Sequence, residues 1–371
     1  MSMVEHVKVV YNELHLQKKL SEEYPLALRL ALVGCGIIAE THHAPQLHTL
    51  PAFELVAAID VDARRRAAVA SKFGIAQHYD DLETALKHTA IDAVAILTPP
   101  ATHVALALTA INAGKHVFIE KPPALTLEDC ERLIAARDAM RVRAMVGFHL
   151  RWHHHTRMLR DLIKDREKSA FIQSTFTSVT PPQISDWRHD FGGDLLTDSA
   201  IHHIDLWQFL SQSEITHISA DRTGDDHVVV NARTANDILL SGSFSRAAIP
   251  ESTIRVFTKT HKFSADFYRF DGLRTVEINE AYGGISALAK SAVQTALELP
   301  RGLRVSRHGG DFAQAYQAQW QHFADCIAQD RAPSASLEDG RESLRVVLAA
   351  HHAMQNHYRV TVDAIGEQST L

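Results

Sequence analysis

The sequence is poor in cysteine. Its 371 residues include only three, Cys35, Cys130 and Cys326, and none of them belongs to a CxxC pair. Three cysteines cannot form a disulfide framework across a chain of this length, and their spacing does not match a zinc ribbon. Low cysteine usage of this kind is typical of the reducing cytosol, so we expect a cytoplasmic protein.

An excess of positive charge is also missing. The chain has 38 Lys and Arg against 44 Asp and Glu, which gives a formal net charge of -6 with neutral histidines. A slightly acidic protein has no general electrostatic attraction for phosphate backbones. We therefore expect no nucleic-acid partner.

Long apolar runs are absent as well. The most apolar segments, such as 28–33 and 93–97, have the length of strands, and none approaches the ~18 residues of a membrane span. The chain start has no secretory signal pattern. Apolar residues at helical spacing, ended by Pro25, predict an N-terminal helical extension over residues 1–27. No membrane partner is expected.

Histidine, in contrast, is abundant, with 24 residues. Such a number suggests a metal site, and the spacing tests that idea. The HExxH motif is absent, and His149 and His153 are four residues apart with no acid nearby. The late group of His351, His352 and His357 has alanine-rich neighbours. We therefore expect no metal site.

Residues 28–148 alternate short apolar runs with helical stretches. Six runs have the composition of buried strands: 28–33, 54–60, 77–79, 92–97, 116–120 and 143–147. Continuous apolar strands separated by helices are typical of a parallel sheet covered on both faces. Right-handed crossovers then give a doubly wound α/β domain of the Rossmann type.

The first of these strands ends in a glycine motif. Gly34, Gly36 and Ala39 fit the pattern GxGxxA between a strand and a helix. The first glycine permits a tight turn, the second lets the backbone approach a pyrophosphate, and the alanine allows close packing of helix on sheet. Because the helix N-terminus favours anions, we expect a dinucleotide here, with Ile37 and Ile38 among the residues that bind it.

Asp60 bears on the choice between the two nicotinamide cofactors. It ends the second strand, at the separation from Gly36 that a ribose-binding acid has. A carboxylate accepts hydrogen bonds from a 2′-hydroxyl and repels a 2′-phosphate, so NAD is favoured. The nearby Arg64, Arg65 and Arg66 are suited to a phosphate, which leaves NADP open.

Polar residues follow the fourth and fifth strands. Thr98, Pro99 and His103 come after the fourth strand, and Glu120 and Lys121 come after the fifth. Ligands of open parallel sheets lie at the carboxyl ends of the strands, so we assign all five residues to the cofactor crevice. A solvated loop lysine is the alternative for Lys121.

A third segment combines acids with a histidine. Asp198, His202 and Asp205 lie in a stretch with helical periodicity over 198–210. Residues four apart share a helix face, and an acid beside a histidine can fix its tautomer. The alternative is that Asp198 caps the helix and His202 packs in the core.

Taken in order, the motifs GxGxxA, TPxxxH, EKP and DxxxHxxD resemble those of the Gfo/Idh/MocA oxidoreductases over about residues 28–362. The resemblance implies a Rossmann domain at residues 28–148. A C-terminal α/β domain at residues 149–371 would follow, with a large, open-faced, mostly antiparallel sheet. It also implies substrates that are sugars, cyclic polyols or their derivatives, with Lys121, Asp198 and His202 facing the nicotinamide.

The chain departs from the family pattern at several places. Ala200 stands where the family often has glycine, and residues 151–157 contain three consecutive histidines. Residues 281–310 have the pattern of a helical insertion. We assign Arg151, Trp187 and Arg188 to substrate binding together with the three family residues.

The second half independently predicts an antiparallel sheet. Alternating or β-branched runs separated by short polar turns lie at 171–179, 217–221, 227–234, 238–244, 254–260 and 262–270. Helices are predicted at about 153–165, 198–211, 312–329 and 338–356. An open sheet face with apolar residues favours pairing of subunits, so we expect a homodimer or homotetramer.

The working hypothesis is hydride transfer between a carbinol carbon and the nicotinamide. His202 is the expected base for the hydroxyl proton, since an ordinary histidine has a pKa near ~6.5. Lys121 would stabilise the developing alkoxide, or would carry the proton if burial favoured its neutral amine. Asp198 would orient His202 or bind a hydroxyl. Two alternatives remain, a glycosidase that oxidises transiently with bound NAD and a non-enzymatic sensor.

Overall fold

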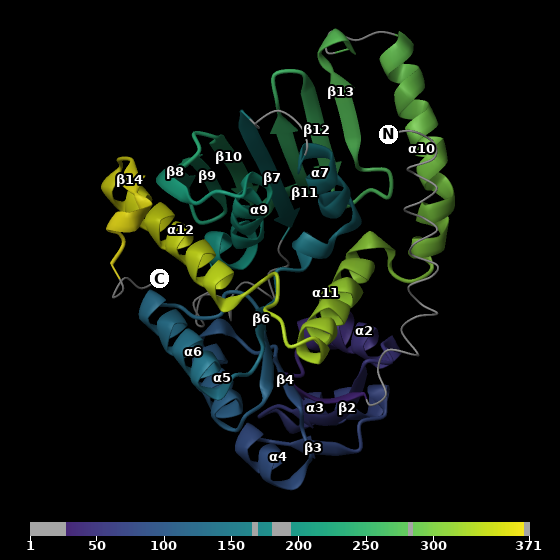
Figure 1. Cartoon of the computed structure of the whole chain (residues 1–371), viewed down its shortest axis with the longest axis vertical. Coiled ribbons are helices and arrows are strands. Elements are labelled where there is room, and N and C mark those ends of the chain that lie inside the picture. Colours follow the sequence, from purple (N-terminus) through teal and green to yellow (C-terminus); the bar gives the residue numbers. More distant parts are fainter. Residues whose placement is uncertain (1–26, 165–169, 180–193, 281–284, 367–371) are drawn as a thin grey trace.

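The computed structural model describes residues 27–164, 170–179, 194–280 and 285–366 (Figure 1). The N-terminal extension predicted at residues 1–27 lies almost entirely outside the described residues. Trp187 and Arg188 also lie outside them.

The first half forms the predicted parallel sheet. Its strand order is β3-β2-β1-β4-β5-β6, in which every neighbouring pair is parallel. The strands are β1 Leu28–Val33, β2 Phe53–Ile59, β3 Gln77–Tyr79, β4 Ala93–Ile96, β5 His116–Ile119 and β6 Ala144–Val146. The order reverses between β1 and β4, where a doubly wound sheet opens its ligand crevice.

Local capping explains the helix boundaries of this half. Asp62, Asp81 and Thr126 accept backbone N–H groups at the starts of α3 (Ala63–Phe73), α4 (Leu82–His88) and α6 (Leu127–Met140). The other helices are η1 Ala39–His43, α2 Ala44–Thr49, η2 Pro100–Thr102 and α5 His103–Asn112. The predicted doubly wound fold is confirmed.

The second half forms an eight-stranded sheet in the order β13-β12-β11-β7-β10-β9-β8-β14. Its pairs are antiparallel except for β7 with β10. The strands are β7 Phe171–Val179, β8 Ile215–Thr223, β9 His227–Thr234, β10 Leu239–Ser245, β11 Ala247–Phe257, β12 His261–Asp266, β13 Arg274–Glu277 and β14 Val360–Thr361. The mostly antiparallel sheet is confirmed, although β11 begins earlier than the predicted 254–260.

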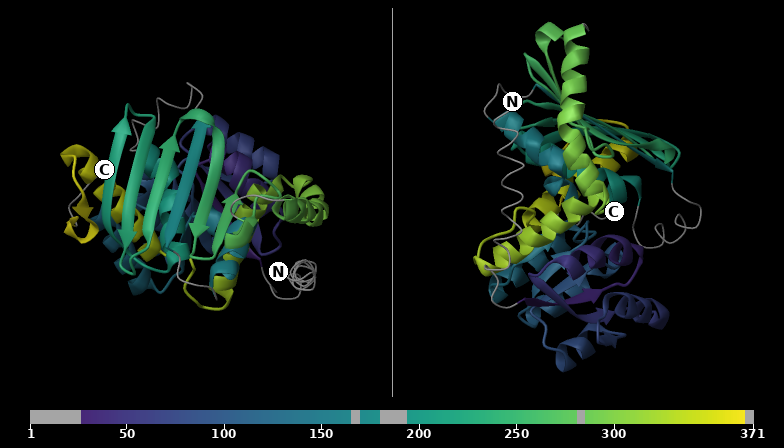
Figure 2. Two further views of the ribbon diagram at one scale, coloured as in Figure 1. Left: turned by 90° about the horizontal axis from the view of Figure 1, so that it is seen from above. Right: turned by 90° about the vertical axis from the view of Figure 1, so that its right-hand side faces the viewer.

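Helices pack between the two sheets (Figures 1 and 2). They are η3 His149–Trp152, α7 His154–Lys164, η4 Leu196–Ala200, α9 Ile201–Ser211, α11 Gly310–Ala328 and α12 Leu337–Asn356. The predicted insertion contains the long helix α10, Ile285–Ser306. Contacts of α11 with α2 and of α12 with α6 fasten the second half onto the first.

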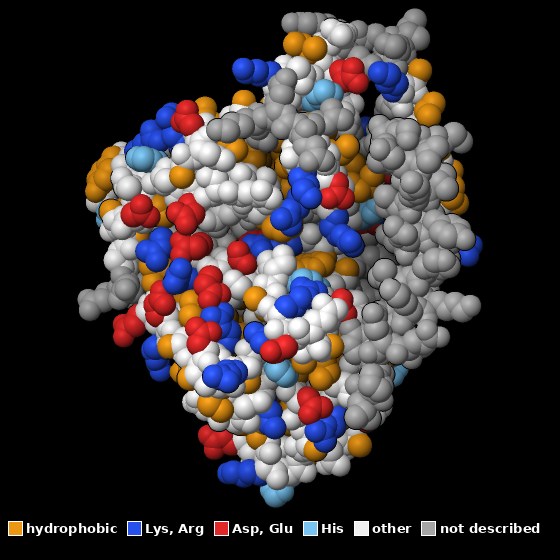
Figure 3. Space-filling model, viewed as in Figure 1, with side chains coloured by type: hydrophobic (Ala, Val, Ile, Leu, Met, Phe, Trp, Pro, Cys, Tyr) orange, Lys and Arg blue, Asp and Glu red, His pale blue; other side chains and the backbone are white. Residues whose placement is uncertain are grey.

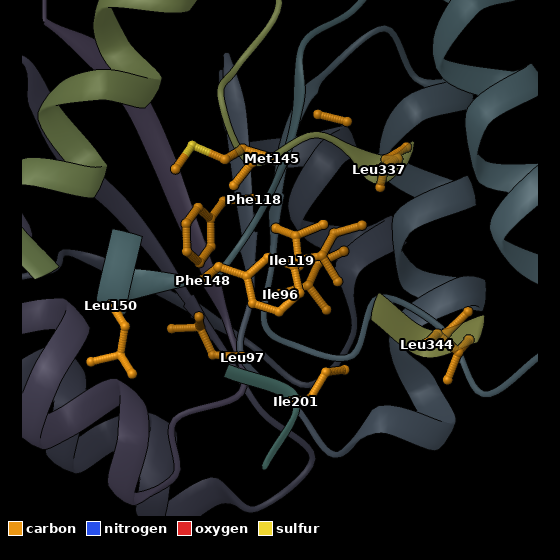
Figure 4. Close-up of a cluster of buried hydrophobic side chains, with 14 of the residues drawn as sticks. Ile96, Leu97, Phe118, Ile119, Met145, Phe148, Leu150, Ile201, Leu337 and Leu344 are labelled. Carbon is orange, nitrogen blue, oxygen red and sulfur yellow. The ribbon is translucent and has the colours of Figure 1, made fainter. Parts of the chain in front are cut away.

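The antiparallel sheet is covered on one face only (Figure 2). In β9, Val228 and Val230 are buried while Val229 and Asn231 are exposed. On the opposite side of the helices, a continuous apolar core lies beneath the carboxyl ends of β4, β5 and β6 (Figure 4). That core includes Phe118 and Phe148, so the loops above it start from rigid positions.

The surface gives no strong electrostatic preference on the face shown in Figure 3, where acidic and basic side chains are interspersed. Among the described residues, no helix is long and apolar enough to cross a membrane.

Candidate active site

The glycine loop after β1 distinguishes two kinds of glycine. Gly34 has φ +91°, and a Cβ there would lie 2.8 Å from the carbonyl carbon of Leu97 and 2.9 Å from Cγ2 of Thr98. A Cβ on Gly36 would meet no protein atom within 4 Å. Gly34 therefore serves the packing of the loop, whereas Gly36 faces open space as a backbone that binds a pyrophosphate must.

Asp60 is tied to this loop by its carboxylate. Oδ2 accepts the N–H of Cys35 at 2.7 Å, and Oδ1 accepts the N–H of Asp62 at 2.8 Å. Each oxygen keeps a second lone pair for a ribose hydroxyl. Arg64 is exposed at the start of α3, and Ile37 is 66% exposed beside Gly36. These residues fit a dinucleotide that crosses the edge of β1 and β2.

Two residues assigned to the cofactor crevice are instead buried behind it. His103 is fully buried, with its ring nitrogens 2.7 Å and 2.8 Å from the carbonyl oxygens of Thr98 and Pro122. Glu120 is 7% exposed, and its carboxylate contacts His43 and the backbone N–H of Lys121. The polar side-chain atoms of both residues bind other protein groups. We therefore correct the prediction of a direct cofactor contact: His103 and Glu120 support the loops after β4 and β5 instead. Thr98 and Pro99 stay partly exposed.

Lys121 reaches across to the helix of the second half. Its Nζ donates to the backbone oxygen of Asp198 at 2.6 Å and to Asp198 Oδ1 at 3.1 Å. Nη2 of Arg246 lies 3.2 Å from the other carboxylate oxygen, Oδ2. Lys121 is 13% exposed and Asp198 25%, so this charge-assisted pair sits at the wall of the crevice rather than in bulk water.

The helical turn at Asp198 differs from the prediction in one respect. Residues Leu196–Ala200 form the π-helical segment η4, and α9 begins only at Ile201. The wider turn disturbs the four-residue spacing on which a bond between Asp198 and His202 was expected. Nδ1 of His202 is buried and has no hydrogen-bond partner among the described residues, and the Asp198 carboxylate is directed to two cations.

His202 is a partly exposed imidazole beside Lys121. Burial, the Lys121 charge and His203 together hold the pKa of His202 well below its usual value. The ring of His149 packs edge-on at a centroid distance of 4.6 Å, and burial likewise lowers the pKa of His149. Both rings are therefore neutral near pH 7 and have an unprotonated nitrogen.

Arg151, assigned to substrate binding, is a buried structural residue instead. Its Nε donates to Asp205 Oδ2 at 2.8 Å, and Nη1 contacts the Ser334 carbonyl and Asp339. Only 6% of Arg151 is exposed. It joins η3 to α9 and α12. Because the carboxylate of Asp205 is hydrogen-bonded to Arg151, it does not assist His202.

Several residues of the site were missed from the sequence. Arg246 lies between β10 and β11, and its guanidinium reaches Asp198 from 48 residues away. His149 and Tyr316 stack at 4.6 Å with an interplanar angle of 12°. Two signals were available: His149 follows the end of β6 by three residues, and Tyr316 lies on the buried face of α11. Neither specifies which side chain points inward.

The sequence matches a known family in both halves. Residues 28–148 match the oxidoreductase family with an NAD-binding Rossmann fold, and residues 157–263 match the GFO/IDH/MocA C-terminal domain. Together with the fold and the site, these matches define the class: the chain belongs to the Gfo/Idh/MocA family of NAD-dependent oxidoreductases. Among the described residues, no three histidine, cysteine or acidic side chains are grouped as a metal site.

Individual relatives are similar at low identity, over most of the chain or over about half of it. The myo-inositol 2-dehydrogenase of Thermotoga maritima is 24% identical over 91% of this chain and 99% of its own. The D-glucoside 3-dehydrogenase of Escherichia coli is 32% identical over 49% of this chain and 54% of its own. The crystal structure of scyllo-inositol dehydrogenase from Lactobacillus casei superimposes with a TM-score of 0.75 at 20% identity, covering 91% of this chain and all of that one.

Proposed function

We propose that the protein oxidises a hydroxyl-bearing carbon of a sugar, a cyclic polyol or a sugar derivative, with NAD as the hydride acceptor, and that it catalyses the reverse reduction as well. One observation carries the proposal. Lys121 follows the carboxyl end of β5 and binds Asp198, and its charge acts on the neutral ring of His202, at the edge of the parallel sheet where the Gly36 loop also follows β1. Relatives named for inositols and glucosides support this substrate class.

Each side chain has a role that its surroundings allow. The partly exposed, neutral His202 accepts the proton of the substrate hydroxyl. The Lys121 ammonium, held by Asp198, donates a hydrogen bond to the same oxygen and stabilises its developing negative charge. Arg246 pairs with the other carboxylate oxygen of Asp198. NAD, when bound along Gly36 and Asp60, supplies the carbon that receives the hydride.

The direct test is a turnover panel with NAD and NADP against free sugars, inositols and their oxidised forms. We expect NADH to accumulate with at least one polyol or sugar, and NADP to be the poorer cofactor because Asp60 repels its 2′-phosphate. Release of an aglycone from glycosides without net NADH would favour the glycosidase alternative. No reaction with either cofactor would contradict the proposal.

A first prediction concerns Lys121. Replacement by alanine removes the only described cation placed at the substrate oxygen, and we expect kcat/KM to fall roughly 10²- to 10³-fold. Lys87→Ala is the matched control, because Lys87 is exposed on α4. Steady-state kinetics on the accepted substrate decide the matter. Near-native turnover of Lys121→Ala would remove Lys121 from the mechanism.

The quaternary structure and location are further parts of the proposal. The open face of the antiparallel sheet exposes Val229 and Leu239 by nearly half, which favours a homodimer or homotetramer through this face. The three cysteines are buried and unpaired, as in cytoplasmic proteins. Sedimentation equilibrium of the wild type and of Val229→Glu tests the first point, with dissociation expected for the variant.

A further inference from the structure

Behind Lys121, three buried side chains form a hydrogen-bonded chain that joins distant segments. Nε1 of Trp320 donates to Nδ1 of His43 at 3.1 Å, and Nε2 of His43 lies 2.9 Å from Oε1 of Glu120. Trp320 and His43 are fully buried, and Glu120 is 7% exposed. Trp320 belongs to α11, His43 to the helix that follows the glycine loop, and Glu120 to the loop that carries Lys121.

The proton positions in this chain follow from the donor chemistry. An indole N–H only donates, so Nδ1 of His43 must be the unprotonated acceptor. The remaining nitrogen, Nε2, then carries the proton of a neutral ring and donates it to Glu120. Oε1 of Glu120 accepts this proton, and the lowered pKa of Glu120 makes the group a carboxylate at neutral pH. The chain therefore has one polarity, from indole to imidazole to carboxylate.

Glu120 is held on its other sides as well. Its Oε2 accepts the backbone N–H of Lys121 at 3.2 Å. A Cβ on Gly147 would lie 2.6 Å from Oε1, so only glycine lets the end of β6 approach this carboxylate. Burial alone raises the pKa of Glu120, but the hydrogen bond from His43 and the Lys121 charge outweigh it, and the net shift is downward.

The rings are fixed in the same positions by packing. Trp320 packs against Phe118 at a centroid distance of 4.1 Å with the rings tilted by 32°, and His43 packs edge-on against Phe118 and Tyr316 at 5.5 Å and 5.0 Å. A ring that cannot rotate holds its hydrogen bonds in one direction. The start of the Lys121 loop is thus set by α11 and by the helix at the cofactor loop.

We propose that Trp320, His43 and Glu120 are positioning residues that aim Lys121 at the substrate oxygen and couple its loop to the helix of the cofactor site. The inference rests on the proposed function, in which Lys121 binds that oxygen. The three residues do not touch the substrate. They act through the backbone of Lys121, and their effect is on turnover more than on cofactor affinity.

The first test removes a single N–H. Trp320→Phe keeps an aromatic ring but leaves Nδ1 of His43 without its donor. Trp207→Phe is the matched control, because Trp207 is also fully buried and donates one hydrogen bond, to Oγ of Ser174 at 2.8 Å, on the sheet. We expect kcat to fall roughly 10- to 100-fold for Trp320→Phe only, with the Kd for NAD changed less than about threefold.

The same pair of variants separates positioning from stability. Both are expected to lower the melting temperature by similar amounts, since each loses one buried hydrogen bond. Equal kcat values for the two variants would overturn the proposal.

The second test is rescue at His43. Glutamine presents an acceptor and a donor at the two ends of one planar group, as the Nε2–H tautomer does, whereas leucine presents neither. We expect His43→Gln to retain at least about ten times the kcat of His43→Leu. Equal loss in both variants, in proteins of equal stability, would contradict a role for the hydrogen-bond polarity.

A spectroscopic test does not depend on any substrate. In the full-length protein labelled with 15N-histidine, His43 is identified by the signal missing from His43→Gln. We expect the neutral Nε2–H tautomer of His43 at pH 7, and we expect the 15N signals of His43 to change in Trp320→Phe. An imidazolium or an Nδ1–H tautomer in the native protein would overturn the relay. A lack of turnover with every sugar and polyol would instead count against the proposed function alone.

Discussion

The protein contains two groups of histidines that differ in what their ring nitrogens contact. Next to Lys121, the buried His149 and the partly exposed His202 have nitrogens without hydrogen-bond partners among the described residues. Under β12, the buried His155 directs its nitrogens to the carbonyl oxygens of Asp266 and Phe270 at 2.9 Å and 3.2 Å. Only the first group adjoins Lys121 and the proposed site.

The difference teaches how to separate function from structure among similar residues. A polar atom that protein already satisfies contributes to stability, and its loss is felt in folding. A polar atom left unsatisfied beside a crevice is costly unless a ligand uses it. By this distinction His155 belongs to the structural group, whereas Nε2 of His153 and Nε2 of His154 are buried without a hydrogen-bond partner among the described residues.

The largest expected effect is seen when one histidine of each group, His202 and His155, is replaced. His202→Gln removes the proton acceptor and should lower kcat/KM roughly 10²- to 10⁴-fold, with little change in stability. His155→Gln should leave kcat within about twofold and lower the free energy of unfolding by about 1–3 kcal/mol, because the segment after β12 loses its contact with α7.

Kinetics of each variant and its urea unfolding curve measure both effects. A catalytic defect in His155→Gln at full stability would remove the distinction between the two groups.

Low pH tests a property of the buried histidines, a pKa that burial lowers. Burial and Arg301 lower the pKa of His154 to about 2, and burial lowers the pKa of His203 to about 3. Both are neutral in the folded protein, while the unfolded chain binds their protons below about pH 6.5. Stability is therefore complete above about pH 6.5 and falls as the pH decreases, by about 1.4 kcal/mol per pH unit and per group.

Urea unfolding at pH 8, 6.5 and 5.5 measures this slope. His203→Leu should reduce it, whereas His88→Gln, at an exposed position on α4, should not. A stability that rises toward pH 5.5 would contradict the neutral state of these buried rings.

The smallest expected effect applies the same distinction to the two glycines of the loop. Gly34→Ala places a methyl group at φ +91° against Leu97, so we expect a loss of about 1–3 kcal/mol in stability. Gly36→Ala meets no protein atom and should fold normally, but its methyl group occupies the pyrophosphate path and should weaken NAD binding. Calorimetric titration measures the NAD affinity of both variants, and thermal unfolding measures the stability of both. Unchanged NAD affinity in a stable Gly36→Ala protein would move the dinucleotide away from this loop.

Much of the first half could be predicted because its signals are local. β1 and β3 have the predicted boundaries, and α4 and α6 begin directly after the capping side chains Asp81 and Thr126. The carboxyl ends of parallel strands meet at one edge, so Lys121 could be placed at the crevice from its position after β5 alone.

The direction of individual side chains could not be predicted in this way. Arg151 was assigned to substrate and faces Asp205, while Glu120 was assigned to cofactor and faces His43. In both cases the partner is more than 50 residues away. The direction of a long side chain depends on which residues pack around it in the folded protein, and the local sequence does not specify them.

The sequence by itself determined the Rossmann half, the antiparallel half, the family and the positions of Lys121, Asp198 and His202, because these depend on periodicity, turn chemistry and motif order. Only the tertiary structure decided which polar groups bind other protein groups and which are left for a ligand. Arg246 meets Asp198, Trp320 meets His43, and His149 meets Tyr316 only after two sheets and the helices between them are packed together. Such contacts carry no periodic signal, since their free energy depends on a burial that exists only in the folded chain.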